Sequence, residues 1–249
     1  MLRQQLTYQL KQALRTATVL VLVLAIGTSQ VRSQQKVTDY IIPASLITIG
    51  AIGVYNTAFC DFKEDIKRNL ADLRGDNYLH FDDYVQYVPV TYFAIGEYIG
   101  TPSKHNFNER MLLGCTAAII MFGTTQGVKH LVGEERPDTR AHTSFPSGHT
   151  ATAFMGAELV RLSYGNWVGL GAYTVAAGIG FLRMYNERHW LNDVIAGAGF
   201  GILSANLAHL LLPWEKSWFK HKDSQKVDMS LLPYCGPHYA MGFDLTIRF

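Results

Sequence analysis

The 249-residue sequence is poor in charge and in cysteine, and both shortages exclude classes of function. Only 17% of residues are charged, the net charge is +2, and no basic run interleaves with aromatic residues, so nucleic acid is excluded as a partner. The three cysteines, Cys60, Cys115 and Cys235, lie far apart without Cys-x-x-Cys spacing, which argues against a zinc site. Cys60 and Cys235 could pair in an oxidising compartment, but unpaired thiols are favoured.

Acidic residues are absent from the first 33 positions, in which three cations (Arg3, Lys11 and Arg15) precede an apolar run over residues 17–26. This order is typical of an export signal. The run is about half of the roughly 20 apolar residues that a membrane span needs, which favours a cleaved signal over an anchor. We therefore predict a signal peptide over residues 1–33, cleaved near Ser33, and a mature protein outside the cytoplasm.

Uncharged stretches of about spanning length indicate transmembrane helices. They are residues 40–60, 111–128, 163–182 and 194–213. Two weaker apolar segments, residues 84–100 and 150–162, carry Glu97 and Glu158, which would need internal partners. The prediction is an all-α fold, a membrane-embedded bundle of about five to six helices. A soluble helical protein is the alternative, since the mean hydropathy is only +0.05.

Small residues support the membrane interpretation, because close helix approach substitutes for the hydrophobic drive that lipid does not supply. The glycines concerned are Gly178, Gly180, Gly197, Gly199 and Gly201. Residues 61–83 are charged throughout, with Ile66, Leu70 and Leu73 at helical spacing, which predicts an amphipathic helix on the membrane surface.

The composition becomes polar again after Pro213, and the chain ends in an alternating apolar run that could add a short strand or remain mobile. The predicted organisation is a signal peptide over 1–33, a first apolar helix and the amphipathic helix over 34–83, a core over 84–213 and a polar C-terminal tail over 214–249.

One loop and helix start gather polar residues suited to an anion. Lys129 follows the end of an apolar helix and Arg136 lies seven residues later in a turn, so both cations can bend over the helix end. Ser147 is placed to cap the next helix, whose first turn contains Gly148 and His149. A helix N-terminus binds anions through its free N–H groups, and a glycine lets that backbone come close. An ordinary serine cap is the alternative for Ser147 taken alone.

A second cluster lies between the last two apolar stretches, where Arg183 ends one and His189 and Asp193 open the next. A histidine and an aspartate four apart share one helix face, so the carboxylate can bind one imidazole nitrogen and leave the other free to attack. Taken alone, such a pair is more often a local surface hydrogen bond.

Alternating helix directions should bring both clusters to one face of the bundle. Three cations, a helix N-terminus and two histidines would then meet, an arrangement that suits a tetrahedral dianion better than a carboxylate or a sugar.

These residues resemble the signature of the type 2 phosphatidic acid phosphatase superfamily, over roughly residues 84–213. Its three parts are K-x6-RP from Lys129 to Pro137, PSGH from Pro146 to His149, and R-x5-H-x3-D at Arg183, His189 and Asp193. Leu182 departs from the family, which usually has a serine before the arginine, and this costs a phosphate hydrogen bond.

The resemblance implies a role for each matching position. His189 resembles the nucleophile that forms a phosphohistidine, Asp193 its orienting acid, and His149 the acid that protonates the leaving alkoxide. The phosphate clamp would be Lys129, Arg136, Ser147, Gly148 and Arg183. No metal or cofactor is expected, because the cations supply the charge stabilisation.

The implied enzyme is a hydrolase of phosphate monoesters or diphosphates whose partners are a membrane and a phosphorylated lipid. Candidate substrates are lipid A, a polyprenyl diphosphate or a phosphatidyl phosphate, and export with this resemblance suggests a bacterial envelope with the active site facing the periplasm. The alternatives are a vanadate-dependent haloperoxidase, a phosphotransferase, and a non-enzymatic anionic-lipid-binding protein or transporter, which would need the cations but not the histidine–aspartate pair.

Overall fold

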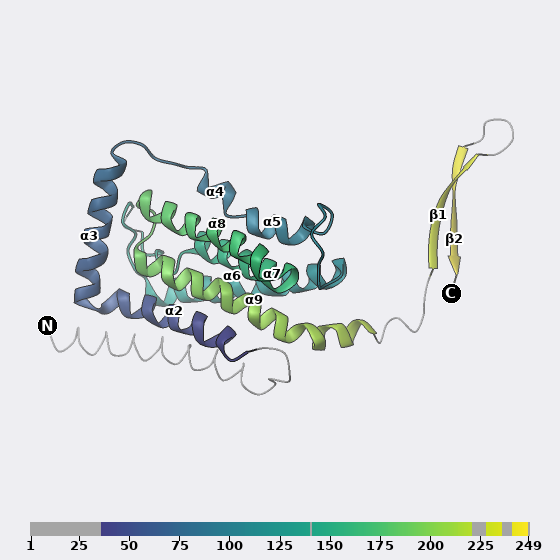
Figure 1. The fold of residues 1–249 in the computed structure, drawn as a ribbon, viewed down its shortest axis with the longest axis horizontal. Coiled ribbons are helices and arrows are strands. Elements are labelled where there is room, and N and C mark those ends of the chain that lie inside the picture. Colours follow the sequence, from purple (N-terminus) through teal and green to yellow (C-terminus); the bar gives the residue numbers. More distant parts are fainter. Residues whose placement is uncertain (1–35, 140, 221–227, 236–240, 249) are drawn as a thin grey trace. The chain divides into compact units, whose positions relative to one another are not determined.

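The computed structural model describes residues 36–139, 141–220, 228–235 and 241–248. The predicted signal peptide lies outside these residues. Helices and one hairpin make up the described part (Figure 1). The helices are α2 (Thr38–Tyr55), α3 (Thr57–Arg74), α4 (Asp82–Val85), α5 (Val88–Ile95), α6 (Phe107–Val132), α7 (Gly148–Tyr164), α8 (Asn166–Tyr185) and α9 (Leu191–Lys220).

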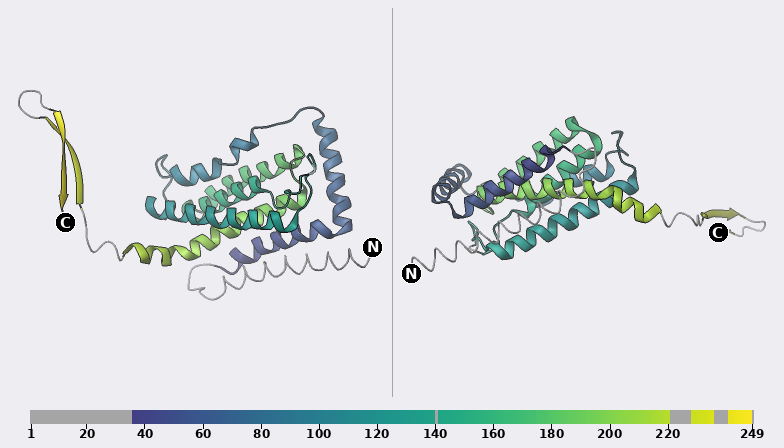
Figure 2. Two further views of the ribbon diagram at one scale, coloured as in Figure 1. Left: turned by 180° about the vertical axis from the view of Figure 1, so that it is seen from behind. Right: turned by 90° about the horizontal axis from the view of Figure 1, so that it is seen from below.

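The predicted helical membrane bundle is confirmed. Helix α7 is central and packs against α5, α6 and α8 (Figures 1 and 2). Four of the described helices, α2, α6, α8 and α9, are long and apolar enough to cross a membrane.

Helix α9 packs against two partners through its glycines. A Cβ on Gly199 would lie 2.7 Å from the Pro43 carbonyl oxygen of α2, and one on Gly201 would overlap the Ala151 carbonyl oxygen of α7. The prediction of close helix approach is therefore confirmed at these positions. It is wrong at Gly178, where an added Cβ would meet no atom within 4 Å.

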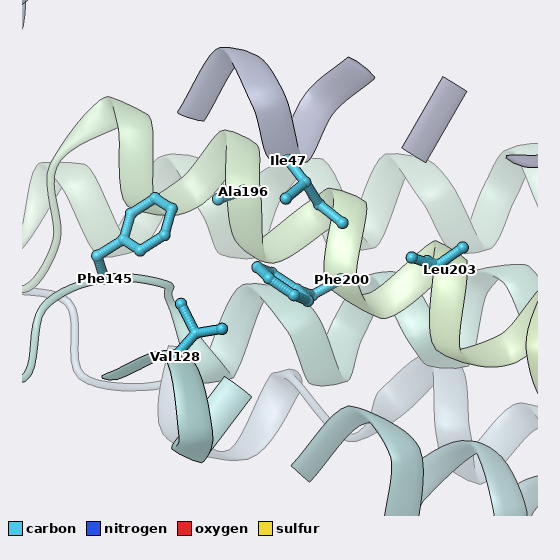
Figure 3. Close-up of a cluster of buried hydrophobic side chains, with 6 residues drawn as sticks. All are labelled: Ile47, Val128, Phe145, Ala196, Phe200 and Leu203. Carbon is cyan, nitrogen blue, oxygen red and sulfur yellow. The ribbon is translucent and has the colours of Figure 1, made fainter. Parts of the chain in front are cut away.

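A cluster of buried apolar side chains joins α2, α6 and α9 beside the loop that precedes α7 (Figure 3). Phe145 of this loop is 2% exposed and packs with Val128 and Ala196. The cluster therefore anchors the loop to the end of α6 and to α9.

Both acids of the weaker segments have internal partners, as predicted. Glu97 pairs with Arg110 of α6 at 2.5 Å. Glu158 in α7 pairs with Arg161 at 2.6 Å and accepts a hydrogen bond from the Tyr173 hydroxyl of α8 at 2.7 Å.

The amphipathic helix ends before the charged segment that predicts it, which extends to residue 83. Helix α3 ends at Arg74, because Gly75 turns the chain with a φ of 56°. Arg74 donates a hydrogen bond to the Tyr185 carbonyl oxygen at 2.9 Å and pairs with Glu187 at 3.2 Å, so α3 crosses the end of the bundle (Figure 1).

Residues from Leu211 onward form a separate compact unit. Helix α9 continues to Lys220, beyond the end predicted at Pro213. Strands β1 (Asp228–Cys235) and β2 (Met241–Arg248) pair antiparallel, with Asp228 opposite Arg248. The alternating apolar run thus contributes a short strand.

Candidate active site

Lys129 connects the end of α6 to the loop before α7. Its buried ammonium group donates hydrogen bonds to the carbonyl oxygens of Thr143 at 2.9 Å and Pro146 at 2.6 Å. The chain can reverse after α6 because Gly133 adopts a left-handed conformation with a φ of 63°. Lys129 therefore shapes the loop as well as placing a positive charge beside it.

The N-terminus of α7 adjoins that of α9. Ser147 caps α7 by accepting from the Thr150 backbone N–H at 3.5 Å, and its own backbone N–H donates to the Asp193 carbonyl oxygen at 3.0 Å. A Cβ added to Gly148 would meet no heavy atom within 4 Å, so open space lies before the first turn. Helix amides in such a place can face an anion.

His189 and Asp193 form a buried pair. The His189 Nδ1 lies 3.3 Å from the Asp193 Oδ2, and the side chains are 2% and 0% exposed. Asp193 Oδ2 also accepts from the Trp190 backbone N–H at 2.9 Å and from the Ser144 hydroxyl at 2.5 Å. These bonds occupy one imidazole nitrogen and fix the ring, which leaves Nε2 for chemistry.

The surroundings of His189 favour its neutral form. Burial is the largest cause that holds its pKa well below the ordinary value, followed by the positive charges of Lys129, Arg183 and Arg136. A neutral imidazole is the form that can attack phosphorus.

Arg183 at the end of α8 faces two acids of α4 that sequence reasoning missed. Its Nη1 donates to Asp82 Oδ2 at 2.6 Å and to Asp83 Oδ1 at 3.2 Å. The same Asp83 oxygen lies 2.8 Å from the His149 Nε2. The predicted residues Arg183 and His149 are thus joined by a carboxylate from outside the three motifs.

Glu134 forms another unpredicted connection at the base of the site. Its carboxylate lies 2.5 Å from the Lys63 ammonium of α3 and accepts a hydrogen bond from the Asn192 amide at 2.8 Å. Burial, followed by the charge of Asp193, raises the pKa of Glu134 to about 8. In the described part of the chain, no group of three or more His, Cys, Asp or Glu residues is placed to hold a metal ion.

Arg136 completes the predicted set of site residues, and Leu182 is the position that departs from the family pattern. Arg136 lies in the loop after α6, and its buried Nε has no hydrogen-bond partner among the described residues. Leu182, the departure from the family pattern, is 9% exposed within α8. Its apolar side chain packs where the family's serine would add a hydroxyl.

Local spacing could not reveal the missed residues. Asp82 and Asp83 form an acidic pair before an apolar segment, but their partner Arg183 lies about 100 positions away. Ser144 precedes the motif that contains Ser147 and has no spacing to Asp193 that a helix pattern would detect. These contacts depend on the tertiary fold.

The fold and this site define a helical membrane protein with a buried histidine–aspartate pair among three cations. Residues 110–217 match the family model described as the PAP2 superfamily, in agreement with the resemblance that the motifs indicate. The match contains all eight predicted site residues and begins further along than the 84–213 range of the motif resemblance.

A curated relative and two solved structures are similar to the chain. It is 32% identical over 196 residues to the lipid A 1-phosphatase of Porphyromonas gingivalis, covering 74% of this chain and 41% of that protein. The chain thus spans less than half the length of that relative.

The fold is shared with a transmembrane PAP2 type phosphatidylglycerolphosphate phosphatase from Bacillus subtilis, with a TM-score of 0.52 and 17% identity over 71% of this chain and 96% of the other. Aquifex aeolicus LpxE gives a TM-score of 0.44 and 19% identity over 57% of this chain and 93% of the other.

Proposed function

We propose that the chain is a metal-independent lipid phosphatase that acts through a phosphohistidine on His189. The observation that carries this proposal is the buried hydrogen bond between His189 and Asp193 beside the positive charges of Lys129, Arg136 and Arg183. A binding protein for anionic lipids would need the cations, but it would have no need of an oriented, neutral imidazole.

The reaction has two displacement steps at phosphorus. In the first, His189 Nε2 forms a bond to phosphorus while the bond to the leaving oxygen breaks, and His149 donates a proton to that oxygen. In the second, water attacks the phosphohistidine, His149 accepts a proton from the water, and His189 departs as neutral imidazole. Histidines suit both transfers near neutral pH.

The remaining residues hold and stabilise the phosphoryl group. Arg136 and Arg183 supply guanidinium donors, and the first turn of α7 at Ser147 and Gly148 supplies backbone amides. Lys129 contributes its charge through the loop that it shapes, since its ammonium is already bonded to carbonyl oxygens. Preorganised charge of this kind stabilises the transition state.

For the substrate, a phosphate group of lipid A is the first candidate, because the curated relative carries the name of a lipid A 1-phosphatase. A polyprenyl diphosphate and a phosphatidyl phosphate are the other lipids to compare. We place the protein in a bacterial envelope with the site facing the periplasm. A membrane-impermeant maleimide should label Asp138→Cys, on the loop before α7, in intact cells with permeabilised outer membranes.

The direct test is phosphate release by the purified chain in detergent. With EDTA present, the native protein should release inorganic phosphate from at least one lipid of the panel, while His189→Ala should bind that lipid and release none. The ranking of lipids would define the substrate class. Equal release by both proteins, or release that EDTA abolishes, would contradict the proposal.

A further inference from the structure

The acidic residue Asp83 on α4 touches two residues of the proposed machinery and has no role in the family motifs. We propose that Asp83 is a positioning residue for His149, the general acid, and this inference rests on the proposed function. Its carboxylate holds the Nε2 of His149, so that the Nδ1 delivers the proton to the leaving oxygen.

The two histidines of the site are oriented through opposite ring nitrogens. Asp193 lies 3.3 Å from the Nδ1 of His189, which leaves Nε2 for attack. Asp83 lies 2.8 Å from the Nε2 of His149, which leaves Nδ1 for proton transfer. A carboxylate at one nitrogen fixes both the tautomer and the ring orientation of a histidine.

The position of Asp83 is itself held by the end of α8. Its neighbour Asp82 is 1% exposed and accepts a hydrogen bond from Arg183 at 2.6 Å. Asn186 donates to the Leu79 carbonyl oxygen at 2.7 Å and accepts from the Leu79 backbone N–H at 3.0 Å. The chain segment that carries Asp83 is therefore attached at Leu79 and at Asp82, both just before the contact with His149.

Charge balance gives a reason for a carboxylate at this place. His149 must carry a proton before the leaving group departs, yet burial and the guanidinium of Arg183 lower its pKa. Asp83 and Asp82 on α4 act in the opposite direction, Asp83 through both its hydrogen bond and its charge. His189 also lies close enough for its titration to respond to charge on His149. Of these facing groups, Asp83 supplies the direct bond that stabilises the imidazolium.

The proton balance of the first step follows from this arrangement. The bond between phosphorus and the leaving oxygen breaks, the bond between phosphorus and His189 Nε2 forms, and the Nδ1 proton of His149 passes to the leaving oxygen. Asp83 stays ionised and retains its hydrogen bond with Nε2, consistent with the lowered pKa of its carboxyl group. It touches no reacting atom.

The test compares two substrates that differ in their need for an acid. An alkyl phosphate leaves as a basic alkoxide and needs protonation, whereas para-nitrophenyl phosphate leaves as a stable phenolate. The value of kcat/KM reports only the steps up to departure of the leaving group, so it isolates the first displacement.

With Asp83→Asn, kcat/KM for the alkyl phosphate should fall by about ten- to a hundredfold, a part of the 10²–10⁴ that general acid catalysis contributes, with little change for para-nitrophenyl phosphate. Asp83→Glu should restore part of the loss. In a His149→Ala background, Asp83→Asn should have no further effect.

Asp138→Asn is the matched control, because it removes a carboxylate paired with a different arginine, Arg188, at 2.9 Å. It should leave the ratio between the two substrates unchanged.

Three results would overturn the inference. An equal loss on both substrates would assign Asp83 to holding Arg183 or the fold. A gain in kcat/KM with a lower KM would make Asp83 a competitor that occupies the place of phosphate beside Arg183. If the native chain released no phosphate from either substrate, the proposed function would fail and this inference with it.

Discussion

The Ser144 hydroxyl donates a hydrogen bond to the Asp193 carboxylate at 2.5 Å and lies 3.5 Å from the His189 Nδ1. The serine is fully buried in the loop before α7, so it connects that loop to the histidine–aspartate pair at the start of α9. Orientation of His189, the proposed nucleophile, therefore involves a residue outside the recognised motifs.

Replacing this serine should weaken turnover more than binding. Ser144→Ala removes a hydrogen bond to a carboxylate, a contact worth about 1.5–3 kcal/mol, and leaves Asp193 less well fixed. We expect kcat to fall about tenfold, equivalent to about 1.4 kcal/mol, with KM nearly unchanged. Steady-state phosphate release measures both constants. A kcat equal to that of the native chain would show that Asp193 does not need the serine.

The pH dependence of the reaction should reflect the lowered pKa of His189. A group whose folded pKa is depressed keeps its neutral form to lower pH, so the acid limb of kcat/KM should lie below the ordinary histidine value of about 6.5. Arg136→Gln removes one of the charges that depress this pKa and should move the limb to higher pH. Comparing the two proteins on one substrate cancels the ionisation of the substrate. A limb that stayed in place or moved to lower pH would contradict this electrostatic account.

The attachment of α3 should depend on Arg74. Arg74→Ala removes a buried cation that is bonded to the Tyr185 carbonyl oxygen and to Glu187, so we expect a loss of about 2–4 kcal/mol and a lower Tm in detergent. Arg68→Ala is the matched control, since Arg68 pairs with Asp65 at 2.8 Å on the exposed surface and should contribute below about 1 kcal/mol. Equal effects of the two variants on thermal unfolding would refute a special role for Arg74.

Glycine substitutions should separate packed from open helix faces. Gly201→Ala places a Cβ against the Ala151 carbonyl oxygen of α7 and should destabilise the bundle by about 1–3 kcal/mol. Gly178→Ala meets open space within α8 and should be neutral or stabilising by up to about 1 kcal/mol. Thermal unfolding of both variants in the same detergent tests this, and a lower Tm for Gly178→Ala would show a neighbour at that face.

Local patterns in the sequence predicted the parts of the site that depend on local geometry. The four-residue spacing of His189 and Asp193 predicted their hydrogen bond, and the position of Ser147 predicted that it caps α7. The length of the apolar stretches predicted the four helices that could span a membrane. Helix α7 is not one of these four, because it has only 17 residues and contains an acid, yet it is the central helix of the bundle.

Contacts between distant segments could not be predicted in this way. The motif spacing predicts Lys129 as a phosphate ligand, but it does not predict that the ammonium also donates hydrogen bonds to loop carbonyl oxygens, which it reaches because the chain reverses at Gly133. Asp83 reaches His149 across 66 positions, and Lys63 reaches Glu134 across 71. No periodic pattern in the sequence predicts such pairings, because they depend on how distant segments pack together in the folded chain.

The central claim is that phosphate passes through His189, and the most direct measurement is to trap that intermediate. The native chain is mixed with a ³²P-labelled lipid phosphate, quenched in alkali within milliseconds, and analysed for acid-labile, alkali-stable label on the protein. We predict label on the native chain at His189, and no label on His189→Ala. Label on His189→Ala, or turnover by the native chain with no labelled protein at any quench time, would contradict the phosphohistidine mechanism.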